Sequence, residues 1–313
     1  MAAYTIIAFN GGGIRGLMSN RIIVRLVEKF PQLLENTQMF AGTSVGAGLA
    51  AHFANGGKAT EFGQWMDNEG ARVIFAHPGS DTSKPAFKNW EFVAAQELLF
   101  GHKILADLPK KAVMTSFQVG GGNPWEPVLF NNFTEEGGKT RVVDAVVGSG
   151  SMPGMFGSHK GCIDGAFVNH DPTLVAIGFA VQAGAALEDI AVLDVGTGLM
   201  AQSIPADQDT AKWGTDQWQT FGKDYPERLP PLLINGSPSP ILNVSLNGTS
   251  TNTTAIIAEM MLGGRFVNVN PTLDTYVSET DIEKIPYLMR VAELCDLTAA
   301  EALIRNNWGV SDN

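Results

Sequence analysis

The first part of the chain alternates short apolar runs with longer segments of helical periodicity. Tyr4–Phe9 is a run of apolar and β-branched residues, which is typical of a buried strand. In Leu17–Phe30 the large apolar residues recur at helical spacing, and Pro31 marks the end of that helix. A second apolar run, Met39–Gly42, leads into a small-residue helix over Val45–Asn55. This order predicts parallel strands covered by helices.

Further strands and helices are predicted beyond residue 55. Residues 56–111 look mainly helical, with an irregular break over His77–Pro85. The predicted strands are Ala112–Val119, Trp125–Asn131, a short strand from Cys162, Ala191–Val195 and Arg265–Asn270. The predicted helices are Trp90–Leu99, Arg141–Gly148, Thr253–Leu262 and Ile282–Leu294. The chain is therefore expected to belong to the α/β class.

No low-complexity linker divides the chain, so we expect one domain over residues 1–313 with a core over residues 4–200. The composition shifts to polar residues, glycine and proline over residues 201–254, with Trp213, Trp218 and Phe221 interspersed. This stretch is either a partly mobile cover over a site or a solvated excursion. Residues 255–313 are expected to return to a strand and helix.

The charge balance excludes some classes of partner. The 313-residue chain has 21 basic and 32 acidic residues, which gives a formal net charge of −11. This excess argues against nucleic-acid binding and against electrostatic capture by anionic membranes. Any contact with a lipid surface is therefore expected to be apolar and transient. Nothing in the sequence determines the oligomeric state.

The cysteines and the first residues bear on the compartment. Cys162 and Cys295 are the only cysteines, and their spacing suits neither a disulfide framework nor a metal site. The N-terminal residues lack a basic segment before their short apolar run, and no apolar stretch is long enough to span a bilayer. We expect a cytoplasmic protein, with export by a route that leaves no cleavable signal still open.

One serine stands at a glycine-lined corner between a predicted strand and a predicted helix. Gly42-Thr43-Ser44-Val45-Gly46 fits the pattern G-x-S-x-G, in which a sharp turn exposes the serine as a nucleophile. Gly42 and Gly46 leave room for that turn. Alone, the pattern also fits an ordinary strand-to-helix turn, so the prediction depends on the motifs around it.

A glycine-rich loop, NGGGIRG over Asn10–Gly16, follows the first predicted strand. A run without Cβ atoms can turn its N–H groups toward a ligand, and the positive end of the next helix points the same way. Gly11, Gly12 and Gly13 are therefore candidate donors to the oxyanion that forms when a serine attacks an ester. Arg15 either braces this loop or adds positive potential.

A third loop supplies a carboxyl group. Asp164 precedes Gly165 and Ala166 where the predicted strand from Cys162 runs into a turn. Because the carboxyl ends of parallel strands meet at one edge of a sheet, we expect Asp164 to lie near Ser44 and the glycine loop. A serine at that edge needs a base, and Asp164 is the candidate. Without the other motifs it would be interpreted as a turn-capping aspartate.

The motifs GGGIRG, GTSVG and DGA, in this order, resemble those of patatin-like phospholipases. Each motif is common, but three in register are specific. The segments Gly150–Phe156, Asn169–Pro172 and Leu193–Gly198 are also similar to the family, so the resemblance covers most of residues 5–200. It implies a three-layer α/β/α fold with a mostly parallel central sheet. It also implies a Ser44–Asp164 dyad that requires no histidine, cofactor or metal.

The resemblance implies roles by position. The oxyanion loop would be Gly11, Gly12, Gly13 and Arg15, and the other motif positions are Gly16, Gly42, Gly46, Gly165 and Ala166. The implied substrates are acyl esters of phospholipids or related lipids. Asn10 departs from the family's more common aspartate, which should alter hydrogen bonding in the loop more than the chemistry. An aspartate base with an ordinary pKa of about 3.9 is weak, so the mechanism requires a partly desolvated carboxylate close to Ser44.

A Ser-His-Asp carboxylesterase acting on soluble esters is the nearest alternative. Five histidines are present: His52, His77, His102, His159 and His170. In α/β-hydrolases the triad follows the chain order serine, acid, histidine. In this chain that order leaves His170 as the histidine and Asp144 or Asp164 as the acid. The short distance in sequence between the glycine loop and Ser44 argues against the α/β-hydrolase fold, which needs several strands there.

Two non-catalytic hypotheses also remain. Gly11–Gly16 satisfies the dinucleotide-binding pattern G-x-G-x-x-G, but the acidic residue expected at the end of the second strand is missing. A lipid-binding protein with an inactive serine corner is the other. A phosphate-loop interpretation of Gly137–Thr140 fails because Phe133 stands where its first glycine is required, so a turn is expected there.

Overall fold

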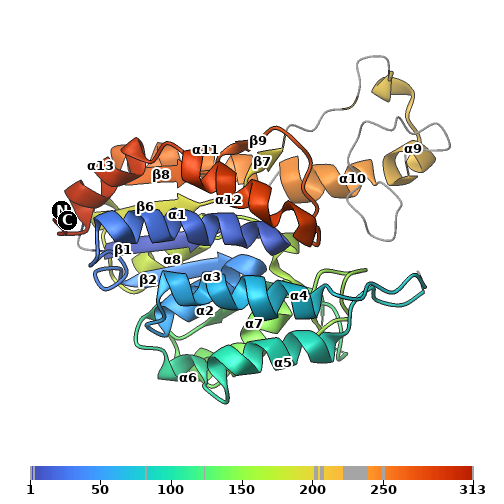
Figure 1. Cartoon of the computed structure of the whole chain (residues 1–313), viewed down its shortest axis with the longest axis horizontal. Helices are drawn as coiled ribbons and strands as arrows, with labels where there is room; N and C mark the ends of the chain where they lie inside the picture. The colour runs from blue at the N-terminus through green and yellow to red at the C-terminus, as the bar shows by residue number, and fades with distance from the viewer. Residues whose placement is uncertain are drawn as a thin grey trace.

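The computed structural model describes residues 2, 4–81, 83–122, 124–200, 204, 208–220, 239–248 and 251–311, without the side chains of residues 68, 69, 220, 247, 248, 251 and 252. It shows a central sheet with helices on both faces (Figure 1). The predicted α/β class with a mostly parallel sheet is confirmed.

The main sheet has seven strands. They are β1 (Tyr4–Phe9), β2 (Met39–Thr43), β3 (Lys111–Gln118), β4 (Glu126–Asn131), β5 (Cys162–Asp164), β6 (Ile190–Val195) and β8 (Phe266–Val269). Their order is β4-β3-β2-β1-β6-β8, and β5 pairs with β3 outside this path. The strands β3, β2, β1, β6 and β8 run parallel, whereas β4 and β5 run antiparallel to β3. A separate pair joins β7 (Leu199–Met200) to β9 (Thr272–Leu273).

Helices cover the two faces of the sheet unequally. The larger layer consists of α1 (Gly16–Lys29), α2 (Val45–Ala54), α3 (Ala59–Trp65), α4 (Ala71–Ile74), α5 (Asn89–Phe100), α7 (Val142–Gly150), α12 (Ile285–Leu294) and α13 (Thr298–Asn307). The smaller layer consists of α8 (Thr173–Gln182) and α11 (Thr251–Leu262). Side chains along β1 point alternately to the two faces of the sheet. Ile7 and Phe9 lie in the core under the larger layer, and Ile6 and Ala8 lie in the core under the smaller one. The remaining helices are α6 (Glu135–Gly138), α9 (Thr215–Thr220) and α10 (Pro240–Asn243).

Some features of the fold differ from the sequence-based expectations. The strand that carries Asp164 is antiparallel, so the expectation that Asp164 follows a parallel strand is wrong. The helices α8 and α13 were not predicted. In residues 201–254 the described parts include α9 and α10, which lie beyond one end of the sheet (Figure 1). There Trp213 and Trp218 stack edge to face with ring centres 5.2 Å apart, while Phe221 lies outside the described residues.

Within the described ranges, none of the helices combines the length and the apolar character needed to cross a membrane.

The close contact between α2 and β1 leaves no room for a side chain at Gly46. We expect Gly46→Ala to lower the free energy of unfolding by at least about 2 kcal/mol, because a Cβ atom there would lie 2.1 Å from the Phe9 carbonyl oxygen. The matched control is Gly178→Ala in α8, where the position is exposed and a Cβ would meet nothing within 4 Å. This control should be neutral or more stable by up to about 1 kcal/mol. Urea unfolding measures both, and equal stability of the two variants would contradict the proposed crowding.

Candidate active site

Ser44 lies at the corner between β2 and α2 in a conformation that residues other than glycine rarely adopt. Its φ is 56° and its ψ is −123°. Such a backbone costs on the order of 1–3 kcal/mol and persists where the surrounding structure enforces it. The Ser44 N–H donates to Ser149 Oγ at 2.9 Å, and Thr43 Oγ1 donates to the carbonyl of Asn169 at 2.8 Å. These bonds fix the chain on both sides of the corner.

Two glycines make the corner possible. A Cβ atom on Gly42 would lie 2.0 Å from the Gly46 carbonyl oxygen, and one on Gly46 would meet the carbonyl of Phe9. Neither position can hold a side chain without movement of backbone. The first turn of α2 therefore lies directly against the end of β1, and this places Ser44 beside the glycine loop.

Gly11, Gly12 and Gly13 of the glycine loop differ in what their N–H groups can contact. Gly12 and Gly13, with φ of 150° and 57°, line the same cavity as Ser44. The N–H of Gly11 instead donates to the carbonyl of His170 at 3.1 Å, and its own carbonyl accepts a hydrogen bond from Thr197. The Gly11 N–H is therefore already engaged, so the expectation that Gly11 donates to an oxyanion is corrected. Gly12 and Gly13 remain as candidates.

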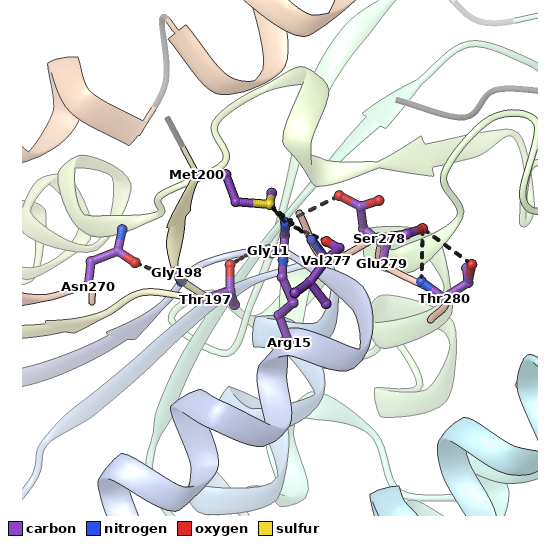
Figure 2. A network of polar contacts seen from close by, with 10 residues as sticks. All are labelled: Gly11, Arg15, Thr197, Gly198, Met200, Asn270, Val277, Ser278, Glu279 and Thr280. Atoms are coloured by element: carbon purple, nitrogen blue, oxygen red, sulfur yellow. Dashed lines mark hydrogen bonds and ion pairs between the residues drawn. The ribbon is translucent and has the colours of Figure 1, made fainter. Parts of the chain in front are cut away.

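Arg15 is not one of the residues that line the cavity. Its buried guanidinium donates to the carbonyl of Val277 at 3.2 Å and pairs with Glu279 Oε1 at 3.2 Å (Figure 2). Of the two roles expected for Arg15, this geometry favours the brace over direct contact with an oxyanion.

Asp164 reaches the cavity from the antiparallel strand β5. The register pairs it with Ser116, near the carboxyl end of β3. The side chain is fully buried, and its Oδ1 accepts a hydrogen bond from the N–H of Ala166 at 2.8 Å. Gly165 is needed between them because a Cβ atom there would lie 2.2 Å from the Thr115 carbonyl oxygen. The DGA motif therefore forms a tight turn that directs the carboxyl group into the site.

Burial controls the acidity of Asp164. Removal from water raises the pKa of Asp164 to about 7, while the Ala166 N–H and the Ser44 side chain oppose that rise and the charge of Glu279 adds to it. The Ser44 hydroxyl is thus near enough to affect this pKa, whereas no described residue gives Asp164 Oδ2 a short hydrogen bond. A carboxyl group with this pKa is a much stronger base than an ordinary aspartate.

The cavity encloses about 940 Å³, counting its open mouth. Ser44, Asp164, Gly12 and Gly13 form a polar patch in its lining. Most of the remaining wall is apolar and comes from α3, α4, α5, α7 and the segment after α7; it includes Phe62, Trp65, Ile74, Phe75, Phe92 and Phe156. Small polar patches within apolar walls are typical of sites that bind apolar ligands and orient one polar group.

His170 lies beside this arrangement. A Cβ atom built on Gly11 would lie 3.3 Å from Ser44 Cβ and 3.4 Å from His170 Nε2, so both side chains flank Gly11. Burial, together with the positive charge of Arg15, lowers the pKa of His170 to about 4. His170 is therefore neutral at pH 7.

Two other histidines form hydrogen bonds away from the cavity. His52 Nε2 bonds to the carbonyl of Lys58 at 2.9 Å, and His159 Nε2 bonds to Asp144 Oδ1 at 2.8 Å. Neither lines the cavity. In the part of the chain that the structure describes, no group of three or more His, Cys, Asp or Glu side chains is placed to hold a metal ion.

Two polar residues of the site were missed from sequence. Ser149, which accepts the Ser44 N–H, was expected only as part of a helix end. Glu279, which lines the cavity and pairs with Arg15, carries no motif. The GSG pattern that ends α7 was a usable signal for Ser149, whereas no local pattern points to Glu279.

A serine corner, a glycine loop and a buried acid around one cavity of an α/β fold are typical of serine ester hydrolases. Residues 7–177 match the family model Patatin, described as patatin-like phospholipase. The chain belongs to the patatin-like phospholipase family, and the resemblance inferred from the three motifs is confirmed.

Relatives match over almost the whole chain. CotR, a sporulation protein of Bacillus subtilis (strain 168), is 30% identical over 322 residues, which cover 99% of either chain. Protein teg of Priestia megaterium is 29% identical over 321 residues, which cover 98% of this chain and all of teg. Both therefore share the tail beyond residue 177 as well as the matched domain.

Two solved structures are similar at lower identity. VipD from Legionella pneumophila has a TM-score of 0.45 and 11% identity, and the match covers 93% of this chain and 66% of VipD. The type III effector ExoU has a TM-score of 0.42 and 14% identity, covering 97% of this chain and 53% of ExoU.

The raised pKa of Asp164 should make the rate of ester hydrolysis depend on pH near neutrality. If Asp164 is the base, only its carboxylate accepts the Ser44 proton, so kcat/KM for an ester should rise through a midpoint near pH 7 and level off above about pH 8. A His170 base, with its pKa near 4, would instead give a flat profile over the same range. Initial rates on a soluble short-chain ester, measured from about pH 5 to 9 at constant ionic strength, separate the two.

Proposed function

We propose that this protein is a serine lipid acyl hydrolase in which Ser44 is the nucleophile and Asp164 its base. The observation that carries the proposal is the shared cavity: Ser44 at the corner, buried Asp164 and the loop glycines Gly12 and Gly13 line one apolar-walled space. The family match supports hydrolysis of lipid esters. The proposed substrates are phospholipids or related acyl esters.

In the proposed mechanism Asp164 accepts the hydroxyl proton of Ser44 while Ser44 Oγ forms a bond to the acyl carbon. The carbonyl electron pair moves onto oxygen, where the N–H groups of Gly12 and Gly13 stabilise the negative charge. When the tetrahedral intermediate collapses, the alcohol part of the ester leaves with the proton from Asp164. Water then attacks the acyl-serine with Asp164 again as base, which releases the fatty acid and restores Ser44.

A Ser-His hydrolase is the second candidate, because His170 lies beside Gly11 and Ser44. Burial, and after it the positive charge of Arg15, disfavours the protonated imidazole that such a mechanism forms. Dinucleotide binding is less compatible, because the Glu279 main chain packs against Gly13 and already accepts the Ile14 N–H, so this part of the loop is occupied where a pyrophosphate would bind.

The first test uses substitutions at the three side chains. Ser44→Ala and Asp164→Asn should each lower kcat/KM for ester hydrolysis by at least about 10³-fold while the thermal unfolding midpoint stays close to that of wild type. His170→Ala should stay within about tenfold of wild type, because the hydrogen bond to Gly11 uses the His170 main chain. Exposed His102→Ala serves as the matched control.

A fully active Ser44→Ala protein would refute the assignment, and loss of activity in His170→Ala with retention in Asp164→Asn would favour the histidine mechanism. Product analysis of phospholipid incubated with wild type or Ser44→Ala identifies which ester bond is cleaved.

Transient contact with a lipid surface is the second part of the proposal. Leu246 lines the cavity, and Ile241 and Val244, just before it in sequence, are 48% and 46% exposed. The sequence from Leu229 to Ala258 contains no charged residue, although the chain as a whole carries a net charge of −11. Exposed apolar side chains close in sequence to a cavity-lining residue, in a stretch without charge, are suited to weak contact with zwitterionic lipid.

We expect the double substitution Ile241→Asp, Val244→Asp to reduce hydrolysis of phosphatidylcholine vesicles by about tenfold or more, since two charges would oppose contact with the bilayer. Hydrolysis of a soluble short-chain ester should not change. Leu98→Asp, on an exposed apolar position of α5, is the matched control and should affect neither rate. Equal loss on both substrates would indicate damage to the site rather than to membrane contact.

A further inference from the structure

The loop between β9 and α12 packs against the glycine loop through its main chain. The N–H of Ile14 donates to the carbonyl of Glu279 at 2.9 Å. A Cβ atom on Gly13 would lie 2.2 Å from that carbonyl oxygen and 2.5 Å from Glu279 Cβ. Gly13 therefore fits against Glu279 with no space for a side chain, and any shift of Glu279 moves the surface on which the glycine loop rests.

The side chains add a second connection between the two loops (Figure 2). Arg15 Nη2 pairs with Glu279 Oε1 at 3.2 Å, and Arg15 Nη1 contacts the Val277 carbonyl at 3.2 Å and Met200 Sδ at 3.5 Å. The N–H of Val277 lies 3.4 Å from the same sulfur atom. The Arg15 side chain is 2% exposed and that of Glu279 is 22% exposed. Because the Arg15 side of this ion pair is buried, the pair is screened less by salt than a pair between two exposed side chains.

Glu279 also faces the predicted catalytic groups, because it lines the cavity together with Ser44 and Asp164. Among the charged residues described, it is the one whose charge raises the pKa of Asp164, while Arg15 is the cation that faces Glu279. Glu279 lies outside residues 7–177, the range matched by the family model. The matched domain therefore obtains part of its cavity lining from the tail.

We propose that Glu279 is a positioning residue that holds the Gly12–Gly13 N–H groups in place through its contacts with Ile14 and Arg15, and that its carboxylate sets the electrostatic environment of Asp164. This inference rests on the proposed Ser44–Asp164 mechanism. The two variants change these functions in different combinations. Glu279→Gln removes the charge and with it the ion pair to Arg15, while Glu279→Asp keeps the charge and shortens the reach to Arg15.

The test measures hydrolysis of p-nitrophenyl butyrate against pH and the rate constant for labelling of Ser44 by a fluorophosphonate. Glu279→Gln should lower kcat about tenfold with little change in KM, less than the 10²–10³-fold loss of a whole oxyanion donor. Its pH midpoint should move down by roughly 0.5 unit, because loss of a nearby negative charge makes Asp164 easier to ionise. Glu279→Asp should lower kcat while leaving the midpoint in place. Glu283→Gln, at an exposed position of the same segment, is the matched control.

Labelling at about pH 8.5, where Asp164 is ionised in every variant, separates positioning from folding. A positioning role lowers the rate constant, whereas a purely structural role lowers only the fraction of protein that can be labelled. Glu279→Gln with an unchanged rate constant and an unmoved pH midpoint would overturn the inference, and if that variant does not fold, an unchanged rate constant in Glu279→Asp does so. Ser44→Ala in the same assay distinguishes failure of the proposed function, because that variant would then hydrolyse the ester like wild type.

Discussion

The close approach of two backbone segments, the first turn of α2 and the carboxyl end of β1, is the constraint on which the site depends. The parallel register places Phe9 opposite Gly42, so the loops that follow β1 and β2 emerge side by side. Gly46 then allows α2 to start against the Phe9 carbonyl. Without that contact the chain could not turn sharply at Ser44, and the serine and the glycine loop would not face one cavity.

Exclusion of water has two opposite effects at Asp164. It penalises the carboxylate, which costs stability as the pH rises from the ordinary aspartate pKa of about 3.9 through about 7. It also makes the same carboxylate a better proton acceptor for a neighbouring hydroxyl. The N–H of Ala166 limits the penalty, while Glu279 increases it. The basicity of the acid is therefore a balance between these neighbours, and it is not a property of the DGA motif alone.

Sequence patterns predicted the features that are local in the chain. The strands β1 and β2 and the loops after them could be predicted because glycine positions directly indicate the turns that the backbone must make. The direction of β5 could not, since its pairing with β3 depends on contacts between distant segments. The helix α8, with the sequence TLVAIGFAVQ, is apolar on nearly every side and lacks the amphipathic period that identifies a helix. The brace at Arg15 was foreseen as one option, but its partners come from the tail, where no motif indicated them.

The fit of Gly13 against Glu279 means that the two halves of this protein cannot be exchanged independently. A chimaera that joined the N-terminal domain to the tail of a relative would keep all three sequence motifs, yet its glycine loop would meet a surface shaped for another partner. For the same reason, we expect substitutions around Arg15 to be accompanied in evolution by compensating substitutions in the loop after β9.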